Sequence, residues 1–399
     1  MLRSLEEPIS ISQTKRYIGS LEGQEKGPTL IFFGGIHGNE PAGVKALEQV
    51  FSQLQHSKAA IKGSIFGIRG NVPALLRKKR FIDQDLNRLW SSVSIAAIEK
   101  KDRSDLNAEE IELLEIKQTL TVLLKVKSPP FYFIDFHTTS SRTLPFITIN
   151  DALINRKFSQ CFPVPIILGI EEYLEGPLLS RMNQLGYVSL GFESGQHNEH
   201  DAVQNTIAFF WLALVFAGVL DKITVPDFEF YYNELQKSAA GNNSFYEVVH
   251  RHELKNTDDF RMLNGFKSFQ KISEGTFLAI QNKEKIHAEE ATILFMPLYQ
   301  KQGAEGFFLI RKTPKWALRL SEWLRKSKSD VLLTFLPGIS WQNDKRESLM
   351  VNLSIARFFT KSFFHLLGYR NRQVDENHLV MHNRERAAKN KIYRNEPWY

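Results

Sequence analysis

The sequence has a single cysteine, Cys161, and this scarcity excludes internal disulfide bonds. No uninterrupted apolar run reaches membrane-spanning length, because candidates such as residues 207–220 are too short. Residues 1–8 contain no apolar signal core. One cysteine also fits a reducing compartment, so we expect a cytoplasmic protein without a membrane span.

Signatures of nucleotide binding are missing as well. The sequence contains no P-loop, no G-x-G-x-x-G, no internal repeat and no low-complexity tract. At 399 residues, 43% of them hydrophobic, the chain can bury at least one large core, and its length indicates two domains.

The most informative motif is His37-Gly38-Asn39-Glu40, which lies between the apolar run 29–35 and a helical-looking stretch that begins at Pro41. A histidine and a carboxylate three positions apart, on the turn that leaves a buried strand, can both reach one cation. Imidazole and carboxylate together suit zinc. Taken alone, however, such a pair is more often a solvated surface turn.

A second, mostly apolar run, residues 131–136, ends at His137. A run of this kind is typical of a buried parallel strand, and ligands collect at the carboxyl edge of such sheets. We therefore expect His37, Glu40 and His137 to converge on one metal ion, with a fourth position left for water. Asp135 would lie on the same side of the strand as His137 and is a candidate to hold its other nitrogen. A plain strand-end carboxylate is an equal alternative.

Two further segments carry the other groups that a metal-dependent hydrolase needs. Glu193 follows the apolar run 187–190 between two glycines, and a carboxylate in a partly dry pocket can move protons, although a loop glutamate is the alternative. The segment 80–88 brings Arg80 and Arg88 into a compact loop. Arginines can bind a carboxylate or stabilise developing negative charge, but by composition alone they could also be solvated.

Four blocks occur in one order along the chain: H-G-N-E-P-A-G, R-F-I-D-x-D-L-N-R, I-D-F-H-T-T and G-F-E-S-G-Q. Together they resemble the succinylglutamate desuccinylase/aspartoacylase family, which is similar to the zinc carboxypeptidases, over roughly residues 28–205. The resemblance implies the following roles: zinc ligation by His37, Glu40 and His137; acid/base catalysis by Glu193; polarisation of the scissile carbonyl by Arg80; and binding of the substrate's terminal carboxylate by Asn87 and Arg88.

One position departs from the pattern of that family. Its characterised aspartoacylases place a further substrate-binding arginine ten residues before the catalytic glutamate, where this sequence has Asn183. The nearest arginine, Arg181, lies in a predicted helix over residues 177–185, and a shift of two positions rotates it by more than half a turn. The reaction type survives this departure, whereas recognition of an acidic acyl group stays open.

These features predict a zinc-dependent hydrolase that uses metal-activated water to cleave the amide, or an ester, bond of a small N-acyl amino acid or related carboxylate substrate. One alternative is a metallocarboxypeptidase that acts on short peptides or cell-wall fragments and holds the free C-terminus with Arg88. The other is a non-catalytic ligand-binding member of the fold. Cobalt or manganese could occupy the same ligands, and the sequence leaves homo-oligomerisation open.

The apolar patterns predict an α/β fold, with a mixed, largely parallel sheet covered by helices as in the zinc carboxypeptidases. Strand signals occur at 29–34, 63–68, 131–136, 145–149, 164–168 and 187–192, with helical patterns between some of them, which indicates a catalytic domain over residues 1–225. Shorter strand signals at 245–250, 277–280, 292–295 and 306–310 predict a small β domain over 226–312. The family resemblance implies that such a domain narrows access to the metal.

Residues 313–399 hold the basic excess of the chain, with 16 Lys plus Arg against 8 Asp plus Glu. We predict a mostly helical region, because two sets of apolar residues recur at helical spacing: Trp316, Leu320, Trp323 and Leu324, then Leu349, Leu353, Ala356, Phe359, Phe363 and Leu366. Such faces usually pack onto a core. The basic stretch 384–391 could contact nucleic acid or an anionic membrane, but its charges are mixed and no binding motif accompanies them, so we expect neither partner.

Overall fold

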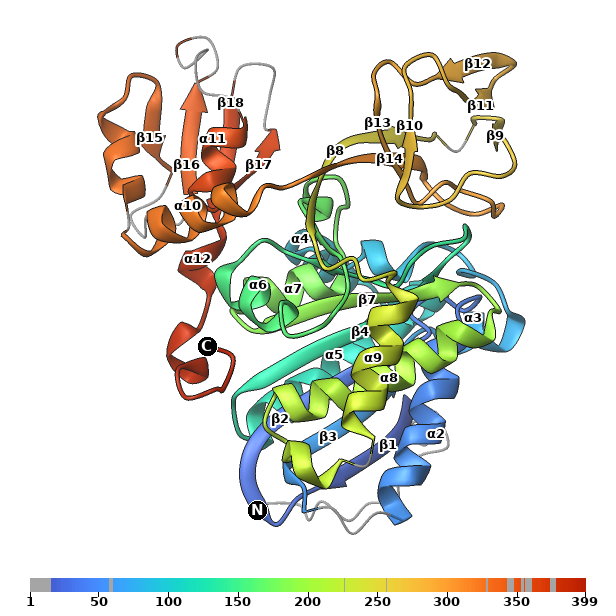
Figure 1. The fold of residues 1–399 in the computed structure, drawn as a ribbon, viewed down its shortest axis with the longest axis vertical. Helices are drawn as coiled ribbons and strands as arrows, with labels where there is room; N and C mark the ends of the chain where they lie inside the picture. The colour runs from blue at the N-terminus through green and yellow to red at the C-terminus, as the bar shows by residue number, and fades with distance from the viewer. Residues whose placement is uncertain are drawn as a thin grey trace.

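The computed structural model describes residues 16–399 except 57–59, 226, 256, 328, 343–347, 353–354, 356–360 and 374–377. Its largest element is an 11-stranded sheet in the order β1-β3-β2-β4-β7-β5-β6-β8-β14-β13-β10 (Figure 1). The strands of this sheet are β1 (Tyr17–Glu22), β2 (Glu25–Gly34), β3 (Lys62–Arg69), β4 (Phe131–Thr139), β5 (Phe146–Ile149), β6 (Ile166–Leu168), β7 (Val188–Gln196), β8 (Phe245–Glu253), β10 (Gln270–Ile272), β13 (Thr292–Phe295) and β14 (Glu305–Lys312).

The centre of the sheet is parallel, with β2 between β3 and β4, and with β7 on the other side of β4. The strand β5 runs antiparallel to β7, and β1 runs antiparallel to β3, so the sheet is mixed as predicted. All six strands predicted before residue 200 are present. Because β2, β4 and β7 are parallel neighbours, their carboxyl ends meet at one edge, where the predicted metal and catalytic residues lie.

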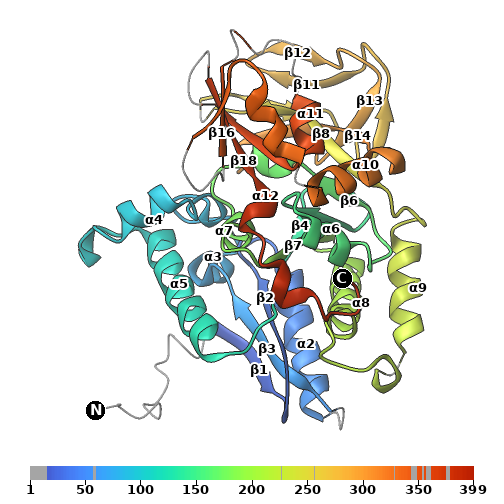
Figure 2. The ribbon, with the colours of Figure 1, turned by 90° about the vertical axis from the view of Figure 1, so that its left-hand side faces the viewer.

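Successive apolar side chains of the central strands point to opposite faces of the sheet, so both faces are apolar. Helices cover both of these faces (Figure 2). Leu30 and Phe32 of β2 pack in one core with the helices α2 (Ala42–His56), α6 (Leu153–Ser159), α8 (His200–Phe216) and α9 (Phe228–Ser238). Ile31 and Phe33 pack in the opposite core with α4 (Ser92–Ile98), α5 (Ala108–Val126) and α7 (Leu178–Gln184). The short helix α3 (Val72–Arg77) follows β3. The helix predicted over residues 177–185 is confirmed as α7.

The four strands predicted between residues 226 and 312 are also present. Three of them, β8, β14 and β13, continue the main sheet through antiparallel pairs, and β8 pairs with β6. The fourth, β11 (Phe277–Gln281), lies in a separate sheet between β9 (Phe260–Met262) and β12 (Glu284–His287). The boundary at residue 225 stays a prediction, because backbone hydrogen bonds join the strands on its two sides.

The C-terminal region combines helices with a second small sheet. Its helices are α10 (Lys315–Lys326), α11 (Lys361–Leu366) and α12 (Arg384–Ala387), and its antiparallel sheet has the order β15 (Ile339–Trp341), β16 (Ser348–Asn352), β18 (His378–Asn383) and β17 (Tyr369–Gln373). The prediction of a helix beginning at Leu349 is wrong, because Leu349 and Val351 face the core of this sheet with the two-residue period of a strand. Leu353, Ala356 and Phe359 of that predicted face lie outside the described residues.

The predicted packing of α10 is wrong for most of its apolar face, although the helix itself is present. Trp316, Leu320 and Trp323 are 67%, 38% and 65% exposed, whereas Leu324 packs against the core of the small C-terminal sheet. The buried residues of α10 are Ser321 and Arg325, since Arg325 forms an ion pair with the buried Asp151 of the catalytic domain. A pattern of apolar side chains cannot reveal a helix that is held by a buried charge.

Among the described residues, we find no helix that is both long enough and apolar enough to cross a lipid bilayer.

Candidate metal and active site

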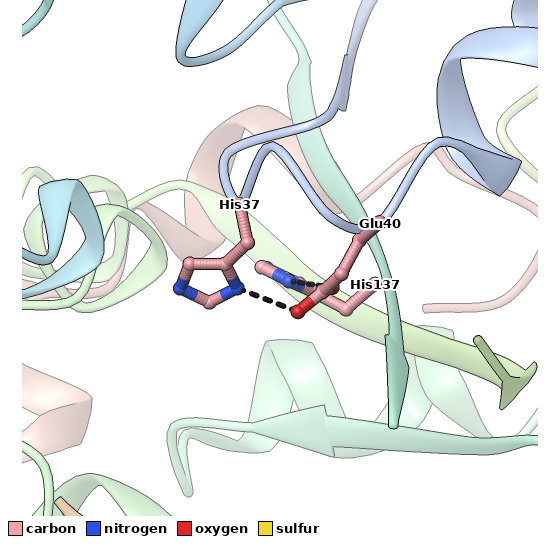
Figure 3. A group of neighbouring side chains, drawn as sticks. All are labelled: His37, Glu40 and His137. Atoms are coloured by element: carbon pink, nitrogen blue, oxygen red, sulfur yellow. Dashed lines mark hydrogen bonds and ion pairs between the residues drawn. The ribbon is translucent and has the colours of Figure 1, made fainter. Parts of the chain in front are cut away.

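The metal group, which we define as His37, Glu40 and His137, lies at the carboxyl edge of the parallel strands (Figure 3). His37 and Glu40 lie on the loop between β2 and α2, and His137 lies near the end of β4. Gly38 is required between the two loop ligands, because a Cβ atom there would lie 2.1 Å from the carbonyl carbon of Ala74. The loop can therefore press against α3 and aim both side chains at His137.

The ligand atoms of the metal group lie within 4.8 Å of one another. Glu40 is at the centre, with Oε1 at 2.9 Å from Nδ1 of His37 and Oε2 at 3.1 Å from Nδ1 of His137. All three side chains are buried. This geometry meets the requirement that the three residues, distant in sequence, can reach one ion.

Each imidazole of the metal group has a carboxylate on its other nitrogen. Nε2 of His137 lies 2.7 Å from Asp135, as the sequence suggested, and Nε2 of His37 lies 3.1 Å from Asp85. Such carboxylates fix the ring orientation and leave the first nitrogen free for a metal. Our sequence reasoning missed Asp85. It occupies the same loop as Arg80 and Arg88, and an acidic residue between those arginines was the available signal.

The surrounding charges keep the site carboxylates ionised. Burial alone would raise the pKa of Glu40, but the charge of His37 and the hydrogen bond from His137 outweigh it and hold the pKa well below its usual range. Burial would likewise raise the pKa of Asp85, but the charges of His37 and Arg80 hold it well below its usual range. A group of ionised, buried oxygens is suited to a cation.

Glu193 lies on β7 directly opposite His137 in the register of the parallel pair. Its Oε2 atom is buried, and in the described part of the chain it has no hydrogen-bond partner. Burial raises the pKa of Glu193 to about 7, with the charge of His137 opposing this shift and that of Glu40 adding to it. A carboxyl with a pKa near neutrality can both accept and donate a proton at physiological pH.

The predicted cationic residues also reach this site. Arg80 lies against the metal group, with Nη1 at 3.3 Å from Glu40 and Nη2 at 3.2 Å from Asp85. Arg88 donates from Nη2 to Glu305 of β14 at 3.1 Å. The Oδ1 atom of Asn87 accepts a hydrogen bond of 3.0 Å from the backbone of Leu178 at the start of α7. Asn87 therefore has a structural contact as well as a place at the site.

The loop that carries these residues is held by Glu109, a second residue that our sequence reasoning missed. Glu109 lies in the first turn of α5 and is fully buried. Its carboxylate accepts hydrogen bonds from three successive backbone amides of the loop, at residues 82, 83 and 84, over 2.7 Å, 2.9 Å and 3.2 Å. No local sequence pattern predicts that Glu109 binds this loop, because the hydrogen bonds join residues that are 25–27 positions apart.

A cavity of about 120 Å³ opens beside the metal group. Its lining includes His37, Arg80, Asn87, Arg88, His137 and Glu193, together with Met296, Glu305 and Phe308 from the later β segment. Residues of that segment therefore line the site, and its narrowing of access to the metal stays a prediction. A larger cavity of about 610 Å³ lies between α6 and α10, but it contains none of the predicted site residues, so size alone does not locate the active site.

Comparison with known proteins finds a family that matches the first half of the chain. Residues 26–209 match the family described as the succinylglutamate desuccinylase/aspartoacylase catalytic domain. The succinylglutamate desuccinylase of Photorhabdus laumondii is 37% identical over 67 residues, which cover 17% of this chain and 21% of that protein. The corresponding enzyme of Pseudomonas putida GB-1 is 28% identical over 119 residues, which cover 29% of this chain and 32% of that protein. The matches thus span between a fifth and a third of these relatives.

Solved structures share the fold at low sequence identity. A succinylglutamate desuccinylase/aspartoacylase from Rhodobacter sphaeroides superposes with a TM-score of 0.54 at 14% identity, over 74% of this chain and 88% of that one. The product-bound ectoine utilization protein EutE (DoeB) from Ruegeria pomeroyi gives a TM-score of 0.53 at 16% identity, with the same coverage. These likenesses support the fold.

Proposed function

Because the chain belongs, through residues 26–209, to the succinylglutamate desuccinylase/aspartoacylase family, we propose that it is a zinc-dependent hydrolase of the amide bond in a small N-acyl amino acid. The observation that carries the proposal is the convergence of the metal group with Glu193 on one cavity. An ester of similar shape would use the same groups.

The metal group fits a divalent ion such as zinc. Ligand atoms bonded to one zinc ion at roughly 2.0–2.2 Å lie within about 4.4 Å of one another, and the three side chains are close to this separation. Two imidazoles and one carboxylate form a donor set of the catalytic type, with three protein ligands. The carboxylates of Asp85 and Asp135 hold the far nitrogens of the two rings, which is the support that metal-binding histidines normally have.

When bound, the ion would polarise the substrate carbonyl and make a water molecule more acidic. Glu193 then has two tasks that match its pKa of about 7: it takes a proton from the attacking water and passes it to the departing nitrogen. A neighbouring cation favours the ionised form of Glu193, which is the form that the first step needs.

Arg80 and the residues after it complete the proposed mechanism. Arg80 lies against the metal group and would donate to the carbonyl oxygen as its negative charge develops. Arg88 and Asn87 line the same cavity and would bind the terminal carboxylate of the substrate. Because Arg88 already contacts Glu305, the substrate carboxylate must share or replace that contact.

The direct test is an assay of the purified protein against N-acyl amino acids with acidic, aromatic and aliphatic parts on each side of the amide. We expect hydrolysis that is lost after chelation and restored by zinc. Hydrolysis that persists without metal, or a metal-loaded protein that cleaves no member of the panel, would overturn the proposal. Unacylated dipeptides belong in the same panel, because release of their C-terminal residue would instead indicate a carboxypeptidase.

A further inference from the structure

The cavity beside the metal group has two chemically different walls. The near wall carries His37 and His137 of the metal group, Glu193 and two arginines, Arg80 and Arg88. The far wall is formed by the end of β5 and the segments after it, with the polar residues Thr148, Asn150, Glu171 and Ser180. Among the described lining residues, the far wall contributes no lysine or arginine. Both arginines that line the cavity belong to the near wall, whereas Arg370 lies close to Glu171 without lining the cavity.

Glu171 leaves one hydrogen-bond acceptor unused on the far wall. Its side chain is 1% exposed. Oε1 accepts a hydrogen bond of 2.9 Å from the backbone amide of Asp151, whereas Oε2 is buried and has no partner in the described part of the chain. Arg370 supplies a countercharge, with Nε at 3.9 Å from Oε1. A buried acceptor without a partner is costly unless a ligand or water completes it.

Asn150 leaves one hydrogen-bond donor unused on the same wall. Its Oδ1 atom accepts a hydrogen bond of 3.1 Å from Oγ of Ser180, and its Nδ2 atom is buried without a partner among the described residues. Asn150 and Glu171 belong to adjoining segments, since Asp151 follows Asn150 and donates to Glu171. The far wall thus has one unpaired donor and one unpaired acceptor, on two residues that both line the cavity.

We propose that this wall binds a carboxamide group of the substrate, with Asn150 donating to its carbonyl oxygen and Glu171 accepting from its nitrogen. The inference rests on the proposed hydrolytic function and names the substrate class of that site. A primary amide presents one acceptor and two donors in a plane, which complements this pair. A carboxylate of the same shape has no donor for the unpaired oxygen of Glu171, so it binds less well.

The test compares pairs of substrates in which one carboxylate is replaced by a primary amide. The first pair is N-acetylaspartate and N-acetylasparagine. The second is N-succinylglutamate and its analogue in which the free carboxylate of the succinyl group is an amide. We expect kcat/KM to favour the amide by about 10- to 100-fold for at least one pair. Equal rates, or a preference for the carboxylate in both pairs, would overturn the inference while leaving the hydrolytic function intact.

Two isosteric variants assign the preference to the far wall. Glu171→Gln keeps an oxygen for Asp151 but removes the charge, and Asn150→Asp replaces the donor with an acceptor. Both should reduce the amide preference at least fivefold, whereas Glu175→Gln, an exposed change in the same loop, should leave it unchanged. A preference that survives in both variants would contradict the assignment. Metal content checks that each variant is folded.

Calorimetric binding of the same pairs to the metal-loaded Glu193→Gln variant gives a readout without turnover. Tighter binding of the amide, by about tenfold or more, would support the far-wall inference even if no hydrolysis were found and the proposed function failed. Equal binding would overturn the inference whether or not the enzyme is active.

Discussion

Among the buried charged clusters in the described part of the chain, two are each built around one carboxylate. In the metal group, Glu40 lies between two imidazoles. In the second, which we call the Asp151 cluster, the fully buried Asp151 contacts three guanidinium groups: Arg156 of α6, Arg325 of α10 and Arg370 of β17. The first cluster lies within residues 26–209, and the second joins that part of the chain to the C-terminal region.

The difference between the two clusters is the basic partner. An imidazole can lose its proton and offer a lone pair to a metal, whereas a guanidinium keeps its protons and offers only donors. Glu172 and Glu385 supply further countercharge to the arginines of the Asp151 cluster. Asp151 therefore meets only groups that keep their protons, whereas both imidazoles of the metal group can release a proton and bind a metal ion. Burial of a carboxylate alone does not identify a metal site.

The Asp151 cluster also explains where several basic residues of the C-terminal region are used. Arg325 and Arg370 are buried, and they hold the segment that precedes α6 beside the far wall of the cavity. Lys389 lies 3.8 Å from the ring centroid of Tyr187, again within the chain. Basic residues that are in excess in a segment can thus bind acidic and aromatic side chains of the same chain.

The largest effect should come from Glu193→Gln, which removes the proton carrier without changing a described contact of either cluster. We expect kcat to fall by roughly 10²- to 10⁴-fold, because a glutamine cannot move protons, while the metal content stays unchanged. Steady-state kinetics with metal analysis measures both. The matched control is Glu199→Gln, at an exposed position before α8. A Glu193→Gln enzyme with near-full activity would remove Glu193 from the mechanism.

Breaking the Asp151 cluster should chiefly affect stability. Arg370→Met leaves buried carboxylates without one of their partners, and we expect the free energy of unfolding to fall by about 3–5 kcal/mol. Denaturant titration measures this, with Arg394→Met, an exposed change in the same region, as control. A loss below about 1 kcal/mol would show that the cluster contributes no more to the free energy of unfolding than an exposed ion pair does.

Acid should act on the Asp151 cluster through Glu172. Burial alone would raise the pKa of Glu172, but the charge of Arg370 and the hydrogen bond with His365 hold it at about 2. A carboxyl with a depressed folded-state pKa contributes stability above its unfolded pKa of about 4.3, and this contribution is lost as the pH falls toward the folded value. We expect up to about 3 kcal/mol of unfolding free energy to be lost in that window. The unfolding free energies of the wild type and of Glu172→Gln, measured as a function of pH, should approach each other as the pH falls through this window. A difference that stays constant with pH would contradict the account.

A smaller effect should follow from Asp85→Asn, which weakens the support of His37 but keeps the ligand. We expect metal affinity to fall by about 10- to 100-fold, as is usual for a carboxylate behind a metal-binding histidine. Competition with a metal indicator measures the change. The matched control is Asp83→Asn, two residues away, whose carboxylate accepts from the backbone of Ala108. Equal loss in both variants would mean that loop damage, and not the contact with His37, is responsible.

The sequence predicted those parts of the fold and site that rest on local patterns. The apolar runs at β2, β4 and β7 predicted parallel strands, and their ends located His37, His137 and Glu193. The contacts of Asp85, Glu109 and Asp151 were not foreseen, because each joins a carboxylate to a partner outside its own local pattern. The buried face of α10 was misjudged for the same reason, since Arg325 is buried by its ion pair with Asp151.

The most direct test of the central claim is metal binding by chelator-treated protein, followed by titration calorimetry with zinc. We predict one ion per chain for the wild type, and no binding above background for the folded His37→Ala/His137→Ala double variant. A wild-type protein that binds no divalent ion, or a double variant that binds zinc as tightly as the wild type, would contradict the account.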